Sequence, residues 1–439
     1  MTEQHSAPRA KIGKRLAAAF KVLGPGLITG AADDDPSGIA TYSQTGAQFG
    51  FGQIWTALYQ IPLLIAVQEA CARIGIVTGK GLAGVIKEHY SRTILFGVVL
   101  LVIVANTINI GADIGAVAAS AQLVVKAPYA VYIVLTAVVV IVLEVFMSYK
   151  SYARVLKWMT LALLAYPATA LIVHEPWKQI LYATFVPHIE FSFAFLFIIT
   201  GVFGTSISPY MFFWQASQEI EEEIEQGLVA QDGSKHRVSR RFLRGMKVDT
   251  NAGMIASEVV QWFIIMTTAT VLFSHGVKNI ATAADAAKAL EPLVRSFPNS
   301  GQIARDLFAV GVVGLGLLAI PVLAGSAAYA FAEALNWKEG LSRKLAQAPG
   351  FYGVIILSVL VGLSFNFLGI DPIKALVFTA VFNGVAAVPL IFIIGLINGN
   401  AKIMGRQRGG PLSRTFVWIT FVVMGLAAGA LIYTSFMPK

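Results

Sequence analysis

Long apolar stretches recur along nearly the whole chain, and they constrain its fold more than any other feature. A helix rises 1.5 Å per residue, so about 20 apolar residues cross a hydrocarbon layer roughly 30 Å thick. Only 13% of the 439 residues are charged, whereas soluble domains have about 25%. The sequence therefore predicts an all-α integral membrane protein with about eleven transmembrane helices. The eleven windows are 23–48, 52–76, 93–123, 127–148, 155–174, 191–218, 250–274, 304–334, 350–369, 373–397 and 415–436.

The basic residues that give the chain its net charge of +9 lie mainly in the loops on one side of the predicted membrane topology. If the N-terminus is cytoplasmic, 25 of the 33 Lys and Arg residues fall in inside segments, as the positive-inside rule requires. We therefore predict a multi-pass protein of the inner (plasma) membrane whose C-terminus lies outside, with residues 1–22 as a cytoplasmic tail. Membrane lipid is the expected surrounding, and nucleic-acid binding is not predicted. The oligomeric state is left open, since a monomer suffices for this pattern.

Two of the windows contain an internal proline flanked by small polar residues, Pro36 in the first and Pro209 in the sixth. Proline removes a backbone donor and clashes with the preceding turn, so each span should be interrupted. Interrupted backbone at membrane depth is tolerated where it lines a cavity. The two spans stand five apart, which gives their units opposite orientations, as in inverted-repeat transporters. We predict repeats over 23–174 (spans 1–5) and 191–397 (spans 6–10), then an additional helix at 415–436.

Three consecutive aspartates, Asp33 to Asp35, precede the first of these prolines. Each costs about 2.5 to 3.5 kcal/mol at the bilayer centre, so a function is expected. Carbonyl oxygens freed at a break join a carboxylate in attracting a cation. Asp35 is therefore predicted as a ligand. For Asp33 and Asp34 the alternative is that they lie at the membrane boundary and cap a half-helix.

Other polar residues in the spans do not indicate an enzyme. A magnesium-dependent membrane enzyme would need a second Asp-rich cluster, and the six histidines lie in tails, loops or span ends. We predict no enzymatic activity and no cofactor. Glu69 is expected to pair with Arg73 one turn further on. The glutamates at 221–223 are interpreted as a solvated helix face.

Three motifs resemble the Nramp divalent-metal transporter family: DDDPSG in the first span, GTSISPYMFFWQ in the sixth and ANTINIGADIGAVAAS in the third. The resemblance implies a LeuT-like fold, in which a ten-span inverted repeat is followed by extra helices. It also implies transport of divalent transition metals, usually with protons. The family motif DPGN falls on residues 35–38, so Asp35 is kept and Gly38 stands where asparagine is usual.

The sixth and third spans depart further from the family pattern. The usual alanine falls on Thr205, the methionine on Ser208 and the histidine on Tyr210. The paired acids of the third span fall on Asn109 and Ala112, which leaves Asp113 one place off. In the tenth span, Asn383 lies near the place of a usual glutamine.

These departures favour a hard, hydrated cation. Serine in place of methionine leaves oxygen donors only, and small Gly38 and Ser208 would enlarge the site for an ion that keeps its waters. We therefore predict Mg²⁺, and also Mn²⁺, as substrate. The predicted ligands are Asp35 and the carbonyls of Ala32 and Thr205, with Asn109, Asp34 and Tyr210 acting through water and Asn383 nearby. Loss of the histidine predicts little or no proton coupling.

Two alternatives remain open. The first is a proton-coupled Mn²⁺/Fe²⁺ transporter of the same family, which would need Asp113 or Asp34 as a proton relay. The second is an organic-solute carrier of the same fold. Such carriers aim helix N-termini at a substrate carboxylate, which an acidic triplet would repel.

Overall fold

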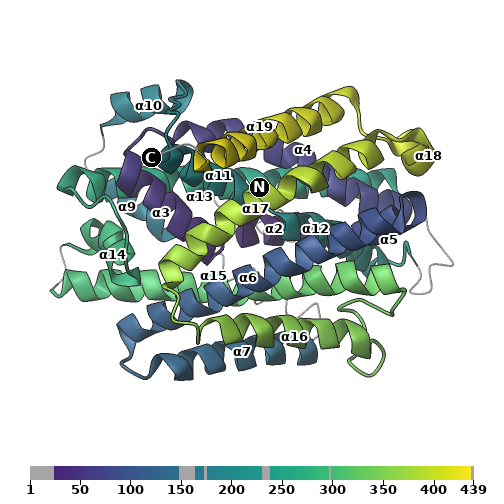
Figure 1. Ribbon diagram of the computed structural model, residues 1–439, viewed down its shortest axis with the longest axis horizontal. Helices are drawn as coiled ribbons and strands as arrows, with labels where there is room; N and C mark the ends of the chain where they lie inside the picture. Colours follow the sequence, from purple (N-terminus) through teal and green to yellow (C-terminus); the bar gives the residue numbers. More distant parts are fainter. Residues whose placement is uncertain (1–23, 148–163, 173–175, 230–237, 296–297, 437–439) are drawn as a thin grey trace, which may run out of the picture.

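The computed structural model describes residues 24–147, 164–172, 176–229, 238–295 and 298–436, which form a bundle of helices lying mostly along its long axis (Figure 1). Every predicted window overlaps a helix in its described part. Residue 23 of the first window, residue 148 of the fourth, residues 155–163 and 173–174 of the fifth, and the predicted tail 1–22 lie outside the described residues. The corresponding helices are α2 (Pro25–Asp33) with α3 (Pro36–Phe49), α4 (Trp55–Thr78), α6 (Arg92–Val124), α7 (Tyr129–Phe146), α9 (Ala165–Ile172), α11 (Phe193–Ser206) with α12 (Pro209–Glu225), α13 (Arg240–Val271), α15 (Ser300–Leu335), α16 (Pro349–Phe365), α17 (Pro372–Gly399) and α19 (Pro411–Ser435).

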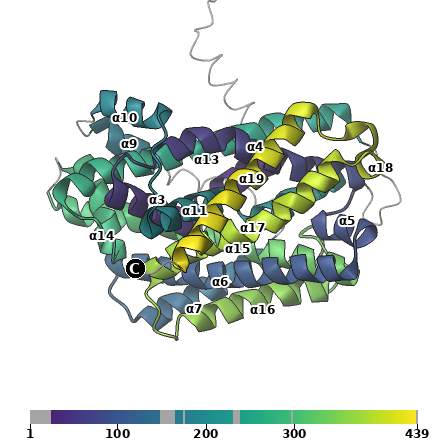
Figure 2. The same ribbon diagram turned by 45° about the horizontal axis from the view of Figure 1, so that its top comes forward.

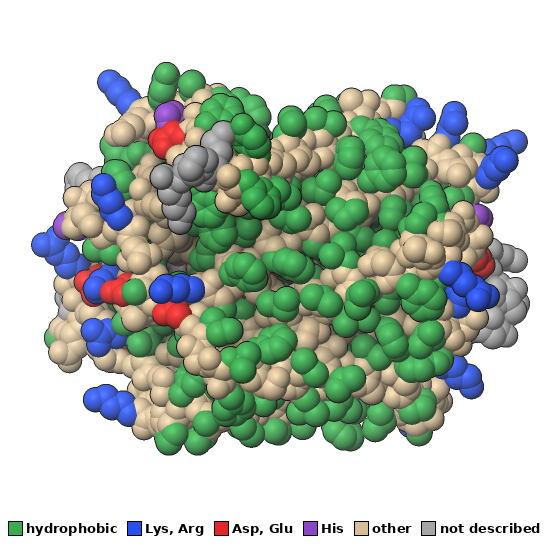
Figure 3. All heavy atoms as spheres, in the orientation of Figure 1, with side chains coloured by type: hydrophobic (Ala, Val, Ile, Leu, Met, Phe, Trp, Pro, Cys, Tyr) green, Lys and Arg blue, Asp and Glu red, His purple; other side chains and the backbone are tan. Residues whose placement is uncertain are grey.

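The surface has the charge distribution of a membrane-spanning bundle. Charged side chains gather at the two ends of the long axis, and a broad hydrophobic band lies between them (Figure 3). Eight helices of the described chain are long and apolar enough to cross a membrane, counting α11 and α12 as one. Short helices lie at the two ends, α10 and α14 at one and α5 and α18 at the other (Figure 2). Their bounds are α5 (Leu82–His89), α10 (Trp177–Phe185), α14 (Ala283–Ala287) and α18 (Ala401–Met404).

Both predicted breaks are present, and each proline begins the second half-helix. Pro36 is the first residue of α3 and Pro209 the first of α12, the position where a missing N–H costs least. A proline pushes the residue before it out of the helical region. Asp35 (φ −60°, ψ 172°) and Ser208 (φ −90°, ψ 143°) are accordingly extended. The division into two repeats stays a prediction.

Helix α2 is fixed in place by α13. A Cβ atom on Gly253 of α13 would lie only 2.1 Å from the carbonyl oxygen of Gly26, so glycine allows the two backbones to touch. Asp249 of α13 accepts hydrogen bonds from the backbone N–H groups of Gly24 (2.7 Å) and Gly26 (2.6 Å). Its negative charge lies at the positive end of the helix dipole. This contact sets where the first break lies in the bundle.

The two expectations about glutamates have opposite outcomes. The predicted pair of Glu69 with Arg73 is confirmed, and Lys247 Nζ lies 2.9 Å from the same carboxylate. The prediction of a solvated helix face at 221–223 is wrong, because Glu221 and Glu223 are buried. The Tyr329 hydroxyl of α15 donates to Glu221 Oε1 over 2.9 Å. Helix α12 is thus covered on this face by α15, which packs against it.

Candidate metal site

The Asp35 carboxylate lies at the first break and is tied to two helices. Its Oδ1 accepts hydrogen bonds from the Gly38 N–H (2.7 Å) and the Ser37 hydroxyl (2.6 Å), so it caps the N-terminus of α3. Its Oδ2 accepts from Asn109 Nδ2 of α6 at 3.0 Å. The side chain is buried. Asp35 therefore holds α3 and α6 together around a negative charge.

The other two aspartates are also fully buried. The Ser257 hydroxyl of α13 donates to Asp33 Oδ2. Asp33 Oδ1 and both carboxylate oxygens of Asp34 have no hydrogen-bond partner among the described residues. Asp34 is the last capping position of α2 but its side chain makes no capping hydrogen bond, and the side chain that caps a half-helix here is that of Asp35. The depth of Asp33 and Asp34 in the membrane stays a prediction. Buried polar oxygens without a donor are costly unless a cation or water satisfies them.

The second break satisfies its own backbone. The single hydrogen of the Ser208 hydroxyl is shared between the carbonyl oxygens of Gly204 (2.5 Å) and Thr205 (2.9 Å) in the last turn of α11. The Tyr210 hydroxyl of α12 donates to the Ala32 carbonyl of α2 over 2.7 Å. Both carbonyls predicted as metal ligands, those of Ala32 and Thr205, therefore already accept a hydroxyl hydrogen.

Gly38 does not open extra space. A Cβ atom at this position would lie 3.0 Å from the Asp33 carbonyl oxygen, 3.2 Å from Thr205 Oγ1 and 3.3 Å from Tyr42 Cε2. These distances are closer than ordinary van der Waals contact between heavy atoms. The first side-chain atom at this position would therefore press on α2, on Thr205 of α11 and on Tyr42 of α3 itself. The structure gives no support to the expected enlargement at Gly38.

Asn109 links the site to a second acid. Its Nδ2, which donates to Asp35, also lies 3.3 Å from Asp113 Oδ2 one turn further along α6. Asp113 is buried. Asn383 is buried on α17, and its Nδ2 has no partner in the described part of the chain. The hydrogen bonds thus join Asn109 to Asp35 and leave Asn383 apart.

Sequence reasoning missed a buried polar network behind the second break. The Ser206 hydroxyl donates to Gln261 Oε1 of α13 (3.0 Å), and Gln261 Nε2 donates to Gln60 Oε1 of α4 (2.9 Å). Glu258, one turn before Gln261, is buried within electrostatic range of Asp33. Both carboxylate oxygens of Glu258 are without a hydrogen-bond partner in the described ranges. The available signal was a glutamine or glutamate inside an apolar window, but no spacing rule showed that these residues meet.

The donor set is composed of oxygen atoms. Within the described chain, no group of three or more His, Cys, Asp or Glu is placed to hold a metal ion. The break instead offers one carboxylate, Asp35, with the Asp34 carboxylate and neutral oxygens close in sequence. Such oxygens suit Mg²⁺, Ca²⁺ and Mn²⁺. A bundle with two interrupted helices and polar groups at both breaks has the architecture of a secondary transporter.

Comparison with known proteins identifies the family. A family model described as "Natural resistance-associated macrophage protein-like" (Nramp) matches residues 26–434. The chain belongs to the Nramp family. It is 24% identical over 434 residues to "Divalent metal cation transporter MntH" of Caldanaerobacter subterraneus subsp. tengcongensis, covering 96% of this chain and 95% of the relative. The protein of the same name from Klebsiella pneumoniae (strain 342) is 25% identical over 446 residues, covering 99% and 98%.

Solved structures agree on the fold. A manganese transporter of Eremococcus coleocola superposes with a TM-score of 0.73 at 19% identity, covering 100% of this chain and 91% of that one. MhsT, solved in complex with L-phenylalanine, gives a TM-score of 0.55 at 14% identity over 94% of this chain and 98% of its own. These likenesses show the LeuT-like fold, with helices 1 and 6 broken.

Proposed function

We propose that this chain transports divalent metal ions across the plasma membrane by alternating access, with Mn²⁺ as its main substrate, and binds the ion at the first helix break. The observation that carries the proposal is the buried Asp35 carboxylate beside Asp34, whose oxygens have no donor in the described chain. Neither forms an ion pair with a described Lys or Arg. A carboxylate at membrane depth needs a counter-charge, and a divalent cation supplies it.

The choice of Mn²⁺ rests on the relatives, which carry manganese or general divalent-metal names. Mg²⁺, the substrate that the sequence placed first, becomes the second candidate. Its support is the oxygen-only break, with Ser208 where the family has a sulfur ligand. The argument from a larger site is withdrawn, because the space beside Gly38 is filled.

Charge balance favours the proton-coupled alternative over transport without protons. Besides Asp35, the buried acids near the breaks are Asp33, Asp34, Asp113 and Glu258. Among the described residues none of them forms an ion pair with Lys or Arg. When the metal ion leaves, protons are the remaining counter-charge within a low-dielectric bundle. The same acids disfavour an organic-solute carrier whose substrate bears a carboxylate.

Uptake into proteoliposomes tests the proposal. Mn²⁺, Fe²⁺, Mg²⁺ and Ca²⁺ are supplied in turn, with a pH-sensitive dye inside the vesicles, for the wild type and Asp35→Ala. We expect Mn²⁺ uptake with internal acidification, and its loss in Asp35→Ala. Asp285→Ala is the matched control, because Asp285 pairs with Lys288 (2.8 Å) in the segment between α13 and α15. Uptake of Mg²⁺ without Mn²⁺ would establish the second candidate, and absence of any metal flux would refute both.

A further inference from the structure

Four basic residues without acidic neighbours in the sequence lie between the end of α17 and the first turn of α19. This basic cluster consists of Lys402, Arg406, Arg408 and Arg414. From residue 372 to the end, the sequence contains no Asp or Glu. None of the four cations forms an ion pair with a residue in the described ranges. Lys and Arg side chains gather at the α18 end of the molecule (Figure 3). These four side chains therefore carry positive charge that no described acidic residue neutralises through an ion pair.

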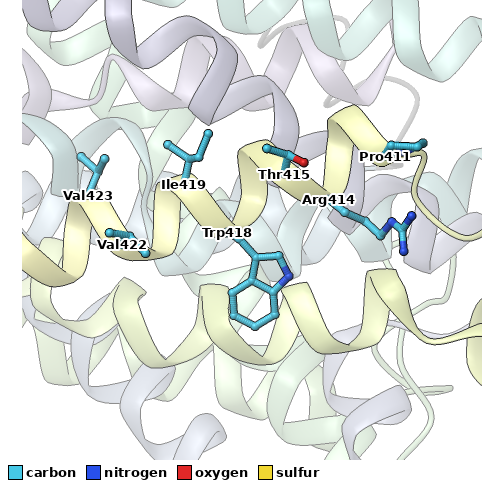
Figure 4. A pocket seen from close by; sticks show the side chains of 7 residues that line it. All are labelled: Pro411, Arg414, Thr415, Trp418, Ile419, Val422 and Val423. Atoms are coloured by element: carbon cyan, nitrogen blue, oxygen red, sulfur yellow. The ribbon is translucent and has the colours of Figure 1, made fainter.

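A shallow groove of about 590 Å³ follows one side of α19 and includes Arg414 of this cluster. Its lining residues recur every three or four positions, so they share one side of the helix. Trp418 and Val422 project below α19, and Arg414 extends toward the Pro411 end of the helix (Figure 4). The groove is polar at its Arg414 end and apolar along the rest of its length. Its lining residues are Pro411, Arg414, Thr415, Trp418, Ile419, Val422 and Val423.

The groove lies on the outer surface of the bundle, and its wall is well supported. Only 28% of the apolar window of α19 is buried. The Trp418 ring packs edge-on against Phe392 of α17 at 5.6 Å between centroids. At the polar end, Arg414 is half-buried, lines the groove and forms no ion pair with a described residue. A cation at this end attracts an anionic group from outside the protein.

We propose that this groove binds one anionic phospholipid. The phosphate of its head group lies at Arg414 and the neighbouring Arg408 and Arg406, and an acyl chain lies along Trp418 and Val422. The predicted topology places this end at the cytoplasmic leaflet, where anionic lipids attract basic clusters next to membrane helices. Charge complementarity selects the head group, and the apolar wall of α19 holds the chain. The site is independent of the metal pathway and of the proposed function.

Quenching of Trp418 by brominated lipids tests the site. The full chain is placed in phosphatidylcholine vesicles that contain a small fraction of dibrominated phosphatidylglycerol or dibrominated phosphatidylcholine. The chain has seven tryptophans, so the signal of Trp418→Phe is subtracted to isolate Trp418. We expect the anionic lipid to quench Trp418 more strongly at equal mole fraction. Each arginine replaced by glutamine should lower this preference by roughly fivefold.

Two further variants separate a built site from general surface charge. Arg406→Gln/Arg408→Gln changes two exposed cations of the cluster and leaves the wall of the groove intact. Lys338→Gln/Lys344→Gln removes two cations from the loop between α15 and α16, outside the groove. We expect only the first pair to reduce the preference. Equal quenching by both lipids, an equal effect of the two pairs, or a Trp418 that neither lipid quenches would overturn the proposal.

Discussion

The two helix breaks have the same backbone and opposite polarity. In each, an extended residue precedes a proline that begins the second half-helix. At the first break, Asp35 accepts hydrogen bonds from N–H and O–H groups that follow it in the chain. At the second break, Ser208 donates its hydroxyl to two carbonyls that precede it. One break thus concentrates negative charge, and the other hides its carbonyl oxygens.

This difference assigns separate tasks to the two breaks. A cation is attracted to the C-terminal carbonyls of α2 and to the nearby carboxylates, since both carry negative charge. The second break acts as a neutral wall that is joined to the first by the hydrogen bond from Tyr210 to Ala32. We infer that the first break supplies the affinity for the ion and that the second adjusts it.

The largest effect is expected from Asp35→Asn. The amide can keep part of the contacts of the cap but loses the charge, so metal binding should weaken by more than the roughly 10- to 100-fold that loss of a supporting group costs. Calorimetric titration with Mn²⁺ measures this directly. Ser208→Asn is the comparison variant at the second break. A larger loss of affinity in Ser208→Asn than in Asp35→Asn would reverse the assignment of tasks.

The second-largest effect is expected from Gly38→Ala, which should lower stability by overpacking the first break. The added methyl group meets the Asp33 carbonyl, Thr205 and Tyr42 at 3.0 to 3.3 Å, and such overpacking costs about 1 to 3 kcal/mol. Gly353→Ala is a matched control, because Gly353 is also helical and has nothing within 4 Å. Thermal unfolding of both variants in detergent gives the comparison. Equal stability of the two would show that space exists beside Gly38 after all.

Ser208→Ala should have a moderate effect, lowering thermal stability and raising the affinity for Mn²⁺. Two carbonyls of α11 lose their donor, which costs about 1 kcal/mol, and become free to bind a cation. We expect lower thermal stability in the absence of metal and a few-fold tighter Mn²⁺ binding. Ser43→Ala is the control, since the buried Ser43 hydroxyl of α3 has no partner in the described chain. Unchanged Mn²⁺ affinity in Ser208→Ala would mean that these carbonyls do not face the ion.

The fold could be predicted because membrane solvation leaves few choices. Apolar windows of sufficient length must be helices. Pro36 and Pro209 interrupt theirs, whereas Pro62, Pro321 and Pro389 lie inside continuous helices. The small polar residues around the first two prolines were therefore the signal that distinguished them.

The site could be predicted only in part. The role of Asp35 could be predicted from its position before a proline. Its contact with Asn109 could not, because the sequence shows the order of the two spans but not how each helix is rotated about its own axis.

The missed contacts depend on which face of each helix turns inward. The hydroxyl of Ser208, the N-cap of α12, turns back onto the last turn of α11, so the Thr205 carbonyl expected to be open already accepts a hydrogen bond. The glutamates at 221–223 look solvated because they end an apolar span, yet α15 covers Glu221. Replacing asparagine by Gly38 would enlarge the site only if the neighbouring groups kept their distance, and here they lie close to the glycine. In each of these cases the outcome depends on how the helices pack and which way a side chain turns, and composition does not encode either.

The smallest effect is expected from Tyr210→Phe, which removes the one side-chain hydrogen bond that directly joins Ala32 to the second break. Its loss leaves the Ala32 carbonyl without this donor, and a hydrogen bond of this kind contributes about 0.5 to 1.5 kcal/mol. Tyr42→Phe is the matched control, because Tyr42 makes a similar bond (2.9 Å) to the hydroxyl of Ser206 and none to the Ala32 carbonyl. We expect similar losses of thermal stability in both variants, but altered Mn²⁺ affinity only in Tyr210→Phe. If both variants bind Mn²⁺ like the wild type, the Ala32 carbonyl is not a ligand, and the ion at the first break is held by carboxylates and water.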